Sequence, residues 1–374
     1  MTLLQALVAL ALFAPGAVAP RAGIDVRELS TFSGAVFAVS LFTSFWSGAV
    51  IARVGSLRVA SLCAASVALS MLLAATGDGR ALLAAGLVLG LAAGPETPAS
   101  SALLGRLVSD HRRALVFSIR QSGNQLGAIA GSLSLPALAI LLAPSYAFLT
   151  VAVCAVCAIA LFELLRPGYP AAGSPPPQLG MRDRFRLVAS DRRLTTLALA
   201  SMPFSALQIA LNTCFVSFAT FELGLAHVEA GAALACAQGG GLVGRVGWGL
   251  VAVRLSARRV LVLTGFGMAM TAVVFGSYGA VLGTPAQFAL AGLFGLTASG
   301  WNGVFIAEIA RLARVDRVAE TTGAVLTASF TGLLLAPLLI AGLDRLAGLG
   351  GAFIVPGLLS AGAALALSRD YERI

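Results

Sequence analysis

The 374-residue chain contains no lysine, so all 25 of its basic side chains are arginines. A nucleotide-binding P-loop requires a lysine after its glycine-rich turn, and the absence of lysine therefore argues against ATP hydrolysis by this chain. The arginines lie in short segments between apolar runs, without interleaved aromatic residues, which is not the pattern of a nucleic-acid-binding surface. The net charge of +9 needs another explanation.

Charged residues of either sign are scarce. They make up 11% of the chain, less than half of the roughly 25% that is usual in soluble domains, whereas apolar residues make up 58%. A chain with so little polar surface cannot face water along its length and is expected in a membrane. One spanning helix needs about 20 apolar residues, so with connectors of about 10 residues the chain has room for roughly twelve spans.

Cysteine and histidine are also few. The five cysteines all lie inside apolar runs, and Cys154 and Cys157 have the spacing of a redox motif but no neighbouring cation to activate a thiolate. The two histidines, His111 and His227, are far apart, which gives little support to a metal site. Residues 239–244 match the dinucleotide-binding pattern G-x-G-x-x-G but lie in an apolar run without a preceding strand. We expect neither a cofactor nor a metal.

The order of apolar runs and polar breaks predicts an all-α membrane protein with twelve transmembrane helices. The polar segment 167–193 divides it into two bundles of six helices, 1–166 and 194–374, and is predicted to be a cytoplasmic linker. The first run resembles a signal peptide but lacks a positive charge at its start, which favours a first span. The predicted spans are 2–20, 30–51, 57–75, 81–104, 114–142, 146–165, 194–221, 229–251, 260–281, 286–309, 318–340 and 350–367.

The arginines predict the orientation of these spans. If both termini are cytoplasmic, nineteen arginines lie in inside loops or the tail, four lie in outside loops and two lie within spans. Arginine is enriched in cytoplasmic loops of membrane proteins. We therefore expect a multi-pass protein of the bacterial cytoplasmic (inner) membrane with both termini in the cytoplasm.

The two halves repeat each other at a constant offset of 201 residues. An ungapped register from the second to the fifth span indicates two homologous bundles around a shared axis. The matching pairs are Gly48 with Gly249, Arg53 with Arg254, Val59 with Val260, Gly94 with Gly295, Gly131 with Gly332 and Pro136 with Pro337.

The loop after the second span carries a recognisable motif. Residues 48–58 are similar to the G-x-x-x-D-R-x-G-x-x-R signature of the major facilitator superfamily, and residues 249–259 form a second copy. The resemblance covers essentially the whole chain and implies a transporter of two six-helix bundles. Both copies lack the acidic residue, which is replaced by Ala52 and Val253, so the charge relay attributed to it cannot operate in its usual form. The arginines expected to act in these gating loops are Arg53, Arg58, Arg254, Arg258 and Arg259.

One ionisable residue lies near the middle of a predicted span. Glu96 is in the fourth span between Pro95 and Pro98, and a charge at the bilayer centre costs about 2.5 to 3.5 kcal/mol on insertion scales. The prolines remove helical hydrogen bonds there, and residues 297–303, at the offset of 201, contain glycine interruptions. Helices interrupted at corresponding places in two halves indicate a binding site. Glu96 is the expected proton-binding residue; the alternative is a packing kink with Glu96 hydrogen-bonded internally.

The fifth span carries Arg120 and Asn124 on one helix face. Arg120 lies about six residues, roughly 9 Å, from the cytoplasmic end of its predicted span, and Arg245 has a similar depth in the eighth span. The resemblance places these two spans opposite each other, so both arginines are candidates for binding an anion; the alternative is that they reach the lipid headgroups. Glycines at every fourth position of 123–131 allow another helix to approach closely.

Four further residues are candidates for the solute site. The resemblance implies that the first, fourth, seventh and tenth spans line a central cavity. Gln208 and Asn212 lie four residues apart in the seventh span, and Trp301 and Asn302 lie in the tenth. An indole ring and amides in such a wall suit stacking on, and hydrogen bonding to, a solute.

These features together predict a secondary active transporter of a small organic, perhaps anionic, solute that works by alternating access and is coupled to protons. We expect a monomer in the lipid bilayer whose partners are the solute and protons, with no nucleic acid. A drug or metabolite efflux antiporter is one alternative, disfavoured because Gly131 and Pro136 are separated where the antiporter signature has them adjacent. A non-transporting sensor is another, and the chain offers no constellation of catalytic groups for an enzyme.

Overall fold

The structure, a computed structural model, describes residues 1–24, 26–169 and 180–369. Almost all of the described residues are helical, and no strand occurs among them. The apolar runs explain this, because a segment in lipid has to satisfy its main-chain hydrogen bonds internally, as a helix does.

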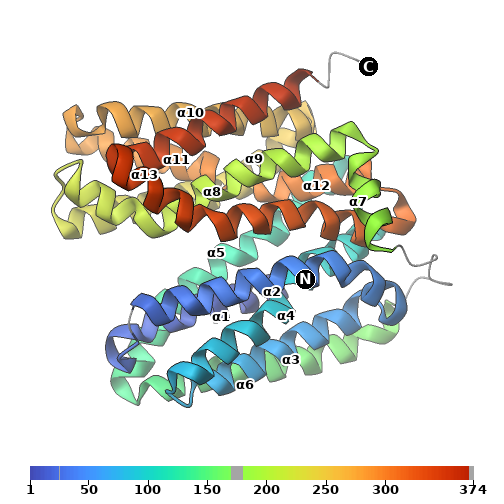
Figure 1. Ribbon diagram of the computed structural model, residues 1–374. Coiled ribbons are helices and arrows are strands. Elements are labelled where there is room, and N and C mark those ends of the chain that lie inside the picture. The colour runs from blue at the N-terminus through green and yellow to red at the C-terminus, as the bar shows by residue number, and fades with distance from the viewer. Residues whose placement is uncertain (25, 170–179, 370–374) are drawn as a thin grey trace. The chain divides into compact units, whose positions relative to one another are not determined.

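The first half of the chain forms long helices that are joined by short turns (Figure 1). Their bounds are α1 (Thr2–Ala22), α2 (Val26–Val54), α3 (Ser56–Ala74), α4 (Gly79–Leu107), α5 (Asp110–Leu141) and α6 (Pro144–Leu165), and the 3-10 turn η1 (Arg166–Gly168) follows.

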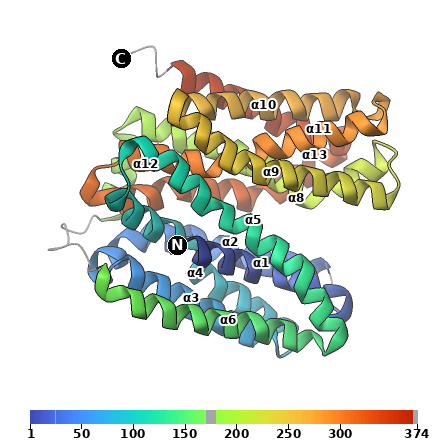
Figure 2. The same ribbon diagram turned by 180° about the vertical axis from the view of Figure 1, so that it is seen from behind.

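The second half contains further long helices and several shorter pieces (Figure 2). Their bounds are α7 (Met181–Ala189), α8 (Arg192–Phe221), α9 (His227–Leu255), α10 (Ala257–Tyr278), η2 (Gly279–Val281), α11 (Thr284–Ala298), α12 (Asn302–Leu312), η3 (Val315–Arg317) and α13 (Val318–Arg369).

Eleven segments of the described chain are long and apolar enough to cross a membrane. The tenth predicted span comprises α11 and α12. Helix α13 contributes to two candidate spans, Val315–Ala336 and Gly342–Arg369, and the second of these includes the break at Gly348. Helix α9 is not among the eleven, because its glycines, Gln238 and Arg245 lower its mean hydropathy, but its 29 residues make it the twelfth span. The chain is therefore an all-α membrane protein with the predicted twelve transmembrane helices in two six-helix halves.

The described residues pack into two units. Unit 1 consists of Met1–Val108, Arg120–Leu187 and Ala313–Thr327, and unit 2 consists of Ser109–Ile119, Val188–Leu312 and Ala328–Ile374. The predicted linker, 167–193, is described only in part: residues 170–179 lie outside the described residues, and α7 occupies much of the remainder. The domain boundaries at 166 and 194 stay a prediction.

Unit 1 is held together by close helix crossings at glycines. On α5, Gly123 and Gly127 lie against the carbonyl groups of Thr2 and Ala6 on α1. The regular glycine spacing of α5 predicted a close partner, and α1 is that partner. A second row of glycines on α4 lies against the main chain of α2 in the same way. This row, which was not predicted, consists of Gly86, Gly90 and Gly94. Small residues let helix backbones approach in a membrane, where contacts between helices replace contacts with lipid.

Unit 2 has an aromatic core. Phe215 and Phe218 of α8 pack with Phe275 of α10, Phe294 of α11 and Phe353 of α13, with ring centroids 4.8 to 6.4 Å apart. Rings at these separations in edge-to-face or tilted arrangements attract each other beyond the simple effect of burial. The core therefore fixes four helices of unit 2 around one cluster.

Helix α13 changes direction at Gly348, whose φ of 72° lies in the left-handed region that favours glycine. The helix resumes beside Glu222, which follows α8. The Gly350 N–H donates to Glu222 Oε2 at 2.9 Å, so the carboxylate satisfies a main-chain donor at the start of the resumed helix.

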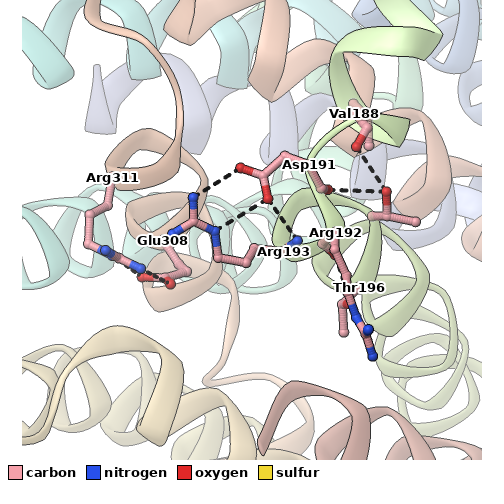
Figure 3. Close-up of polar contacts among 8 residues, drawn as sticks. Val188, Asp191, Arg192, Arg193, Thr196, Glu308 and Arg311 are labelled. Atoms are coloured by element: carbon pink, nitrogen blue, oxygen red, sulfur yellow. Dashed lines mark hydrogen bonds and ion pairs between the residues drawn. The ribbon is translucent and has the colours of Figure 1, made fainter. Parts of the chain in front are cut away.

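Helix α8 begins at a capping aspartate (Figure 3). Asp191 Oδ1 accepts from the main-chain N–H of Arg193 at 2.8 Å, and the Arg193 guanidinium also donates to both carboxylate oxygens at 3.3 Å. Partial burial by itself raises the pKa of Asp191, but the hydrogen bonds and the charge of Arg193 outweigh it and hold this pKa below its usual value. The cap is therefore strongest when Asp191 is ionised.

We expect Asp191→Ala to lower the thermal stability of the protein by about 1 kcal/mol, the usual value of a lost helix cap. A carboxyl group with a lowered pKa stabilises the fold above its unfolded pKa of about 3.9, and this stabilisation is lost as the pH falls through the folded pKa. The difference between wild type and D191A in unfolding midpoint should therefore shrink below about pH 4. Asp191→Asn, which keeps a capping oxygen, is the control; a D191A deficit that is constant with pH would contradict this account.

Candidate functional site

Glu96 lies in the interior of unit 1. Its side chain is 3% exposed, and helix α4 continues without a break through Pro95 and Pro98. The predicted matching interruptions are therefore observed only in the second half, where Ser299, Gly300 and Trp301 separate α11 from α12. The prolines remove donors without ending the helix.

Arg120 of α5 is the partner of Glu96. The Arg120 guanidinium donates to Glu96 Oε1 and to Gln121 Oε1, and it donates to Thr97 Oγ1 at 3.2 Å. Thr97 Oγ1 in turn donates to Glu96 Oε2 at 2.9 Å. The Arg120 side chain is 2% exposed, so the two opposite charges are buried together in a hydrogen-bonded network.

Arg120 lies within the first third of helix α5. Helix α5 begins at Asp110 rather than near residue 114, which places Arg120 ten residues, or about 15 Å, from the helix start instead of about 9 Å. In the structure the Arg120 guanidinium is turned onto Glu96. Asn124, one turn further along α5, is half-buried.

The sequence contains a signal for the Glu96–Arg120 pair in the positions of the two residues along their helices. Glu96 lies eleven residues before the end of α4 at Leu107, and Arg120 lies ten residues after the start of α5 at Asp110. The two helices are consecutive and antiparallel, so nearly equal distances from the turn between them place both residues at about the same height along the helix pair. Opposite charges at the same level in neighbouring spans are expected to pair, since each alone is costly.

The predicted amides of unit 2 form two hydrogen-bonded pairs. Asn302 Nδ2 donates to Gln208 Oε1 at 3.2 Å and to the Ser299 carbonyl at 3.3 Å. Gln238 Nε2 of α9 donates to Asn212 Oδ1 at 2.9 Å. The i,i+4 amides of α8 thus contact α12 and α9, respectively. Gln238 was not a predicted site residue, because it stands alone among glycines and small apolar residues.

Trp301 and Arg245 are both buried in unit 2, each 1% exposed. The Trp301 indole N–H donates to the Ala298 carbonyl at 3.2 Å, and its ring packs against Phe204 and Phe305 at centroid distances of 5.3 and 5.1 Å. In this structure the indole is a packing residue at the α11–α12 break. The roles of Trp301 as a wall for the solute and of Arg245 as an anion ligand stay predictions.

The arginines of the first signature loop differ in their surroundings. Arg53 is exposed, while Arg58 Nη1 contacts Glu163 Oε2 at 3.1 Å. Glu163, at the end of α6, also pairs with Arg166 at 2.6 Å. A carboxylate from another helix therefore lies beside Arg58, although the loop has no acid of its own at Ala52.

The arginines of the second signature loop also differ from one another in exposure. Arg254 and Arg259 are exposed at the end of α9 and the start of α10, and Arg258 is 7% exposed. Arg258 Nε donates to the main-chain carbonyl of Leu367 at 2.8 Å. Both copies of the motif thus keep their arginines, and in each copy one of them contacts another helix: Arg58 contacts α6 and Arg258 contacts α13.

Twelve spans in two repeated halves, with buried charges and amides inside otherwise apolar helices, define a multi-pass helical protein of the transporter class. The sequence profile of the Major Facilitator Superfamily matches residues 1–330, and the chain belongs to this superfamily. Members of this family are transporters rather than enzymes, in agreement with the sequence analysis. No curated protein matches the chain in sequence.

Solved transporters share the fold. The fucose:proton symporter FucP of E. coli has a TM-score of 0.80 at 14% identity, covering 98% of this chain and 97% of its own. The human organic anion transporter MFSD10 has a TM-score of 0.78 at 18% identity, with coverages of 98% and 97%. The proton:xylose symporter XylE has a TM-score of 0.78 at 13% identity, with coverages of 98% and 94%. At these identities, the likeness establishes the fold alone.

Proposed function

We propose that the protein is a secondary active transporter that couples proton movement to the transport of a small organic solute by alternating access. The observation that carries this proposal is the buried Glu96–Arg120 pair. A carboxylate is the only protonatable member of the pair near neutral pH, because a guanidinium keeps its proton in proteins. Proton binding at Glu96 removes its negative charge and leaves Arg120 as a buried cation.

This change links the proton to the solute. A buried cation without a matching anion is strongly destabilising, so a negatively charged group of the solute is favoured beside Arg120 once Glu96 is protonated. Asn124, on the same helix as Arg120, is a proposed hydrogen-bonding group for the solute. In unit 2 the proposed solute-binding residues are the amides Gln208, Asn212 and Asn302, with Arg245 and Trp301 as further candidates. The arginines Arg53, Arg58, Arg254, Arg258 and Arg259 are proposed to act at the gating loops.

The similar proteins support this assignment. Two of them are named as proton symporters and one as an organic anion transporter, which are the two properties combined here. The arginine-rich loops favour a bacterial inner-membrane protein with both termini in the cytoplasm. We propose that it acts as a monomer, since each half of the repeat supplies part of the polar interior.

The proposal is tested with purified protein in proteoliposomes. A thermal-shift panel of carboxylates, amino acids, sugars and cationic drugs first identifies a ligand. We then expect an inward gradient of that ligand to carry protons inward, recorded with a pH-sensitive dye inside the vesicles. Protons moving against the ligand would instead establish an efflux antiporter, and ligand binding without any flux would establish a sensor.

A further inference from the structure

Helix α7 (Met181–Ala189) lies in the predicted cytoplasmic linker and has no part in the proposed transport function. Its nine residues extend about 14 Å, less than half of the roughly 30 Å of hydrocarbon in a bilayer. The helix has a net charge of +2, because it contains three arginines and one aspartate: Arg182, Arg184, Arg186 and Asp183. A helix this short and this charged does not cross the hydrocarbon core.

The described side chains of α7 combine exposed arginines with an exposed aromatic ring. Arg182 and Arg186 are four residues apart, which places them on one face of the helix, and both are exposed. The Phe185 side chain lies beside this face and is 58% exposed. Arginines next to an aromatic residue are typical of helices in the membrane interface, where the ring reaches the acyl chains and the cations stay among the headgroups.

Phe185 is held against helix α2 within unit 1. Its ring lies 4.9 Å from that of Phe45, and the Phe45 ring in turn packs edge-to-face against Trp46 at 5.7 Å. On the neighbouring face of α2, Phe42, Trp46 and Val50 are 65%, 42% and 43% exposed. Exposed apolar side chains at every fourth position of a membrane span face lipid. The contact with Phe45 therefore places Phe185 at the edge of a lipid-facing surface.

The level of this contact agrees with the membrane interface. Phe45 lies about six residues, or roughly 9 Å, from the cytoplasmic end of the predicted span 30–51. An interfacial helix buries its apolar face about 5 to 10 Å into the boundary between headgroups and acyl chains. Tryptophan, here Trp46 beside Phe45, is also enriched at this level.

We propose that α7 binds the cytoplasmic surface of the membrane, with Phe185 among the upper acyl chains and with Arg182 and Arg186 on the phosphate groups of anionic lipids. Guanidinium groups match phosphate oxygens in paired hydrogen bonds. Each arginine close to an anionic surface favours binding about fivefold, whereas a zwitterionic headgroup offsets its phosphate with a cation of its own. An acidic protein would attract the arginines as well, but it would supply no acyl chains to Phe185.

The test uses the purified full chain in nanodiscs whose lipids carry bromine on the upper part of the acyl chains, because bromine quenches a tryptophan that it contacts. Phe185→Trp is introduced together with Trp46→Phe, and W46F alone supplies the background emission of Trp248 and Trp301. Phosphatidylglycerol is then titrated into phosphatidylcholine. We expect the indole at position 185 to be quenched as the phosphatidylglycerol fraction rises.

Arg186→Gln should raise the phosphatidylglycerol fraction needed for half of this quenching about fivefold. Arg106→Gln is the matched control, since it removes an exposed arginine from the end of α4, on the same predicted side of the membrane, and should leave the titration unchanged. Absence of quenching in every lipid mixture would overturn the proposal and favour a protein partner. Equal quenching in the two lipids, or an equal shift in R106Q, would overturn the role of the arginines.

A second measurement needs no substitution. Trypsin cleaves this lysine-free chain only after arginine, and α7 contains three such sites. We expect cleavage within α7 of the wild-type chain to be slower in phosphatidylglycerol discs than in phosphatidylcholine discs. Equal rates would contradict binding of α7 to anionic lipid. Elution profiles and unfolding midpoints of the variants in detergent show that they are folded.

Discussion

Replacing Glu96 by glutamine is expected to abolish uphill uptake of the solute while exchange of solute across the membrane continues. Glutamine keeps the size of the side chain and an oxygen that accepts from Arg120, but it has no proton to bind or release. The variant therefore resembles the protonated state at every pH. Without a change of protonation, the proton gradient does no work on the solute, whereas exchange needs only the reorientation of the loaded carrier.

The measurement compares solute accumulation under an imposed pH gradient with counterflow at equal pH, both in proteoliposomes. Glu222→Gln is the matched control, since it removes a carboxylate charge from the end of α8 and keeps an oxygen for the Gly350 N–H. E222Q should accumulate solute like wild type. If E96Q accumulates solute normally, or loses exchange while coupling persists, the proposed role of Glu96 is wrong.

We also expect E96Q to be less stable to unfolding than wild type. Arg120 in E96Q is a buried cation whose partner has lost its charge, and breaking a buried pair in this way commonly costs about 3 to 5 kcal/mol. Adding Arg120→Gln to E96Q replaces both charges by neutral amides and should recover much of the lost thermal stability. The double variant separates folding from coupling, because we expect its stability to recover while uphill uptake stays absent.

The second large effect is expected at Gly240 on α9. A Cβ atom at this position would lie far inside the contact distance of the Gly292 carbonyl oxygen on α11, and Gly244 meets the carbonyl of Leu296 one turn further on. Gly240→Ala must therefore push α9 away from α11. We expect a destabilisation of about 1 to 3 kcal/mol or more, seen as a lower unfolding midpoint and less folded protein after purification.

The neighbouring residue provides the control. A Cβ atom at Gly239 would meet no other atom within 4 Å, although it lies on the same helix. Gly239→Ala should be neutral or stabilising, since alanine favours a helix over glycine by about 1 kcal/mol. Equal losses in G239A and G240A would contradict the close-packing account. A selective loss in G240A would show that the glycines matching a dinucleotide-binding pattern serve helix packing.

Much of the architecture follows from local patterns of the sequence. The α5 glycines predicted a close helix contact, and the offset of 201 predicted a repeat. Each of these depends on residues close in sequence or on a constant register. The break in the tenth span at 299–301 was predicted in the same way, from glycine within an apolar run.

Contacts between distant residues were harder to predict. The Glu96–Arg120 pair, the Gln238–Asn212 pair and the Glu163–Arg58 contact all join different helices. Apolar composition shows that a helix spans the membrane but contains little information about which face it turns to which neighbour. The interruption predicted at Pro95 and Pro98 was wrong, because α4 continues through both prolines.

The amino-acid sequence by itself determined that this chain is a membrane protein of twelve helices in two related halves, because hydrophobicity and helix length are properties of each segment alone. The tertiary structure decided that Arg120 pairs with Glu96 and that Trp301 is packed against phenylalanines. Those outcomes depend on how each helix is rotated and shifted relative to its neighbours. Burial and charge pairing determine that arrangement only when the whole chain is folded.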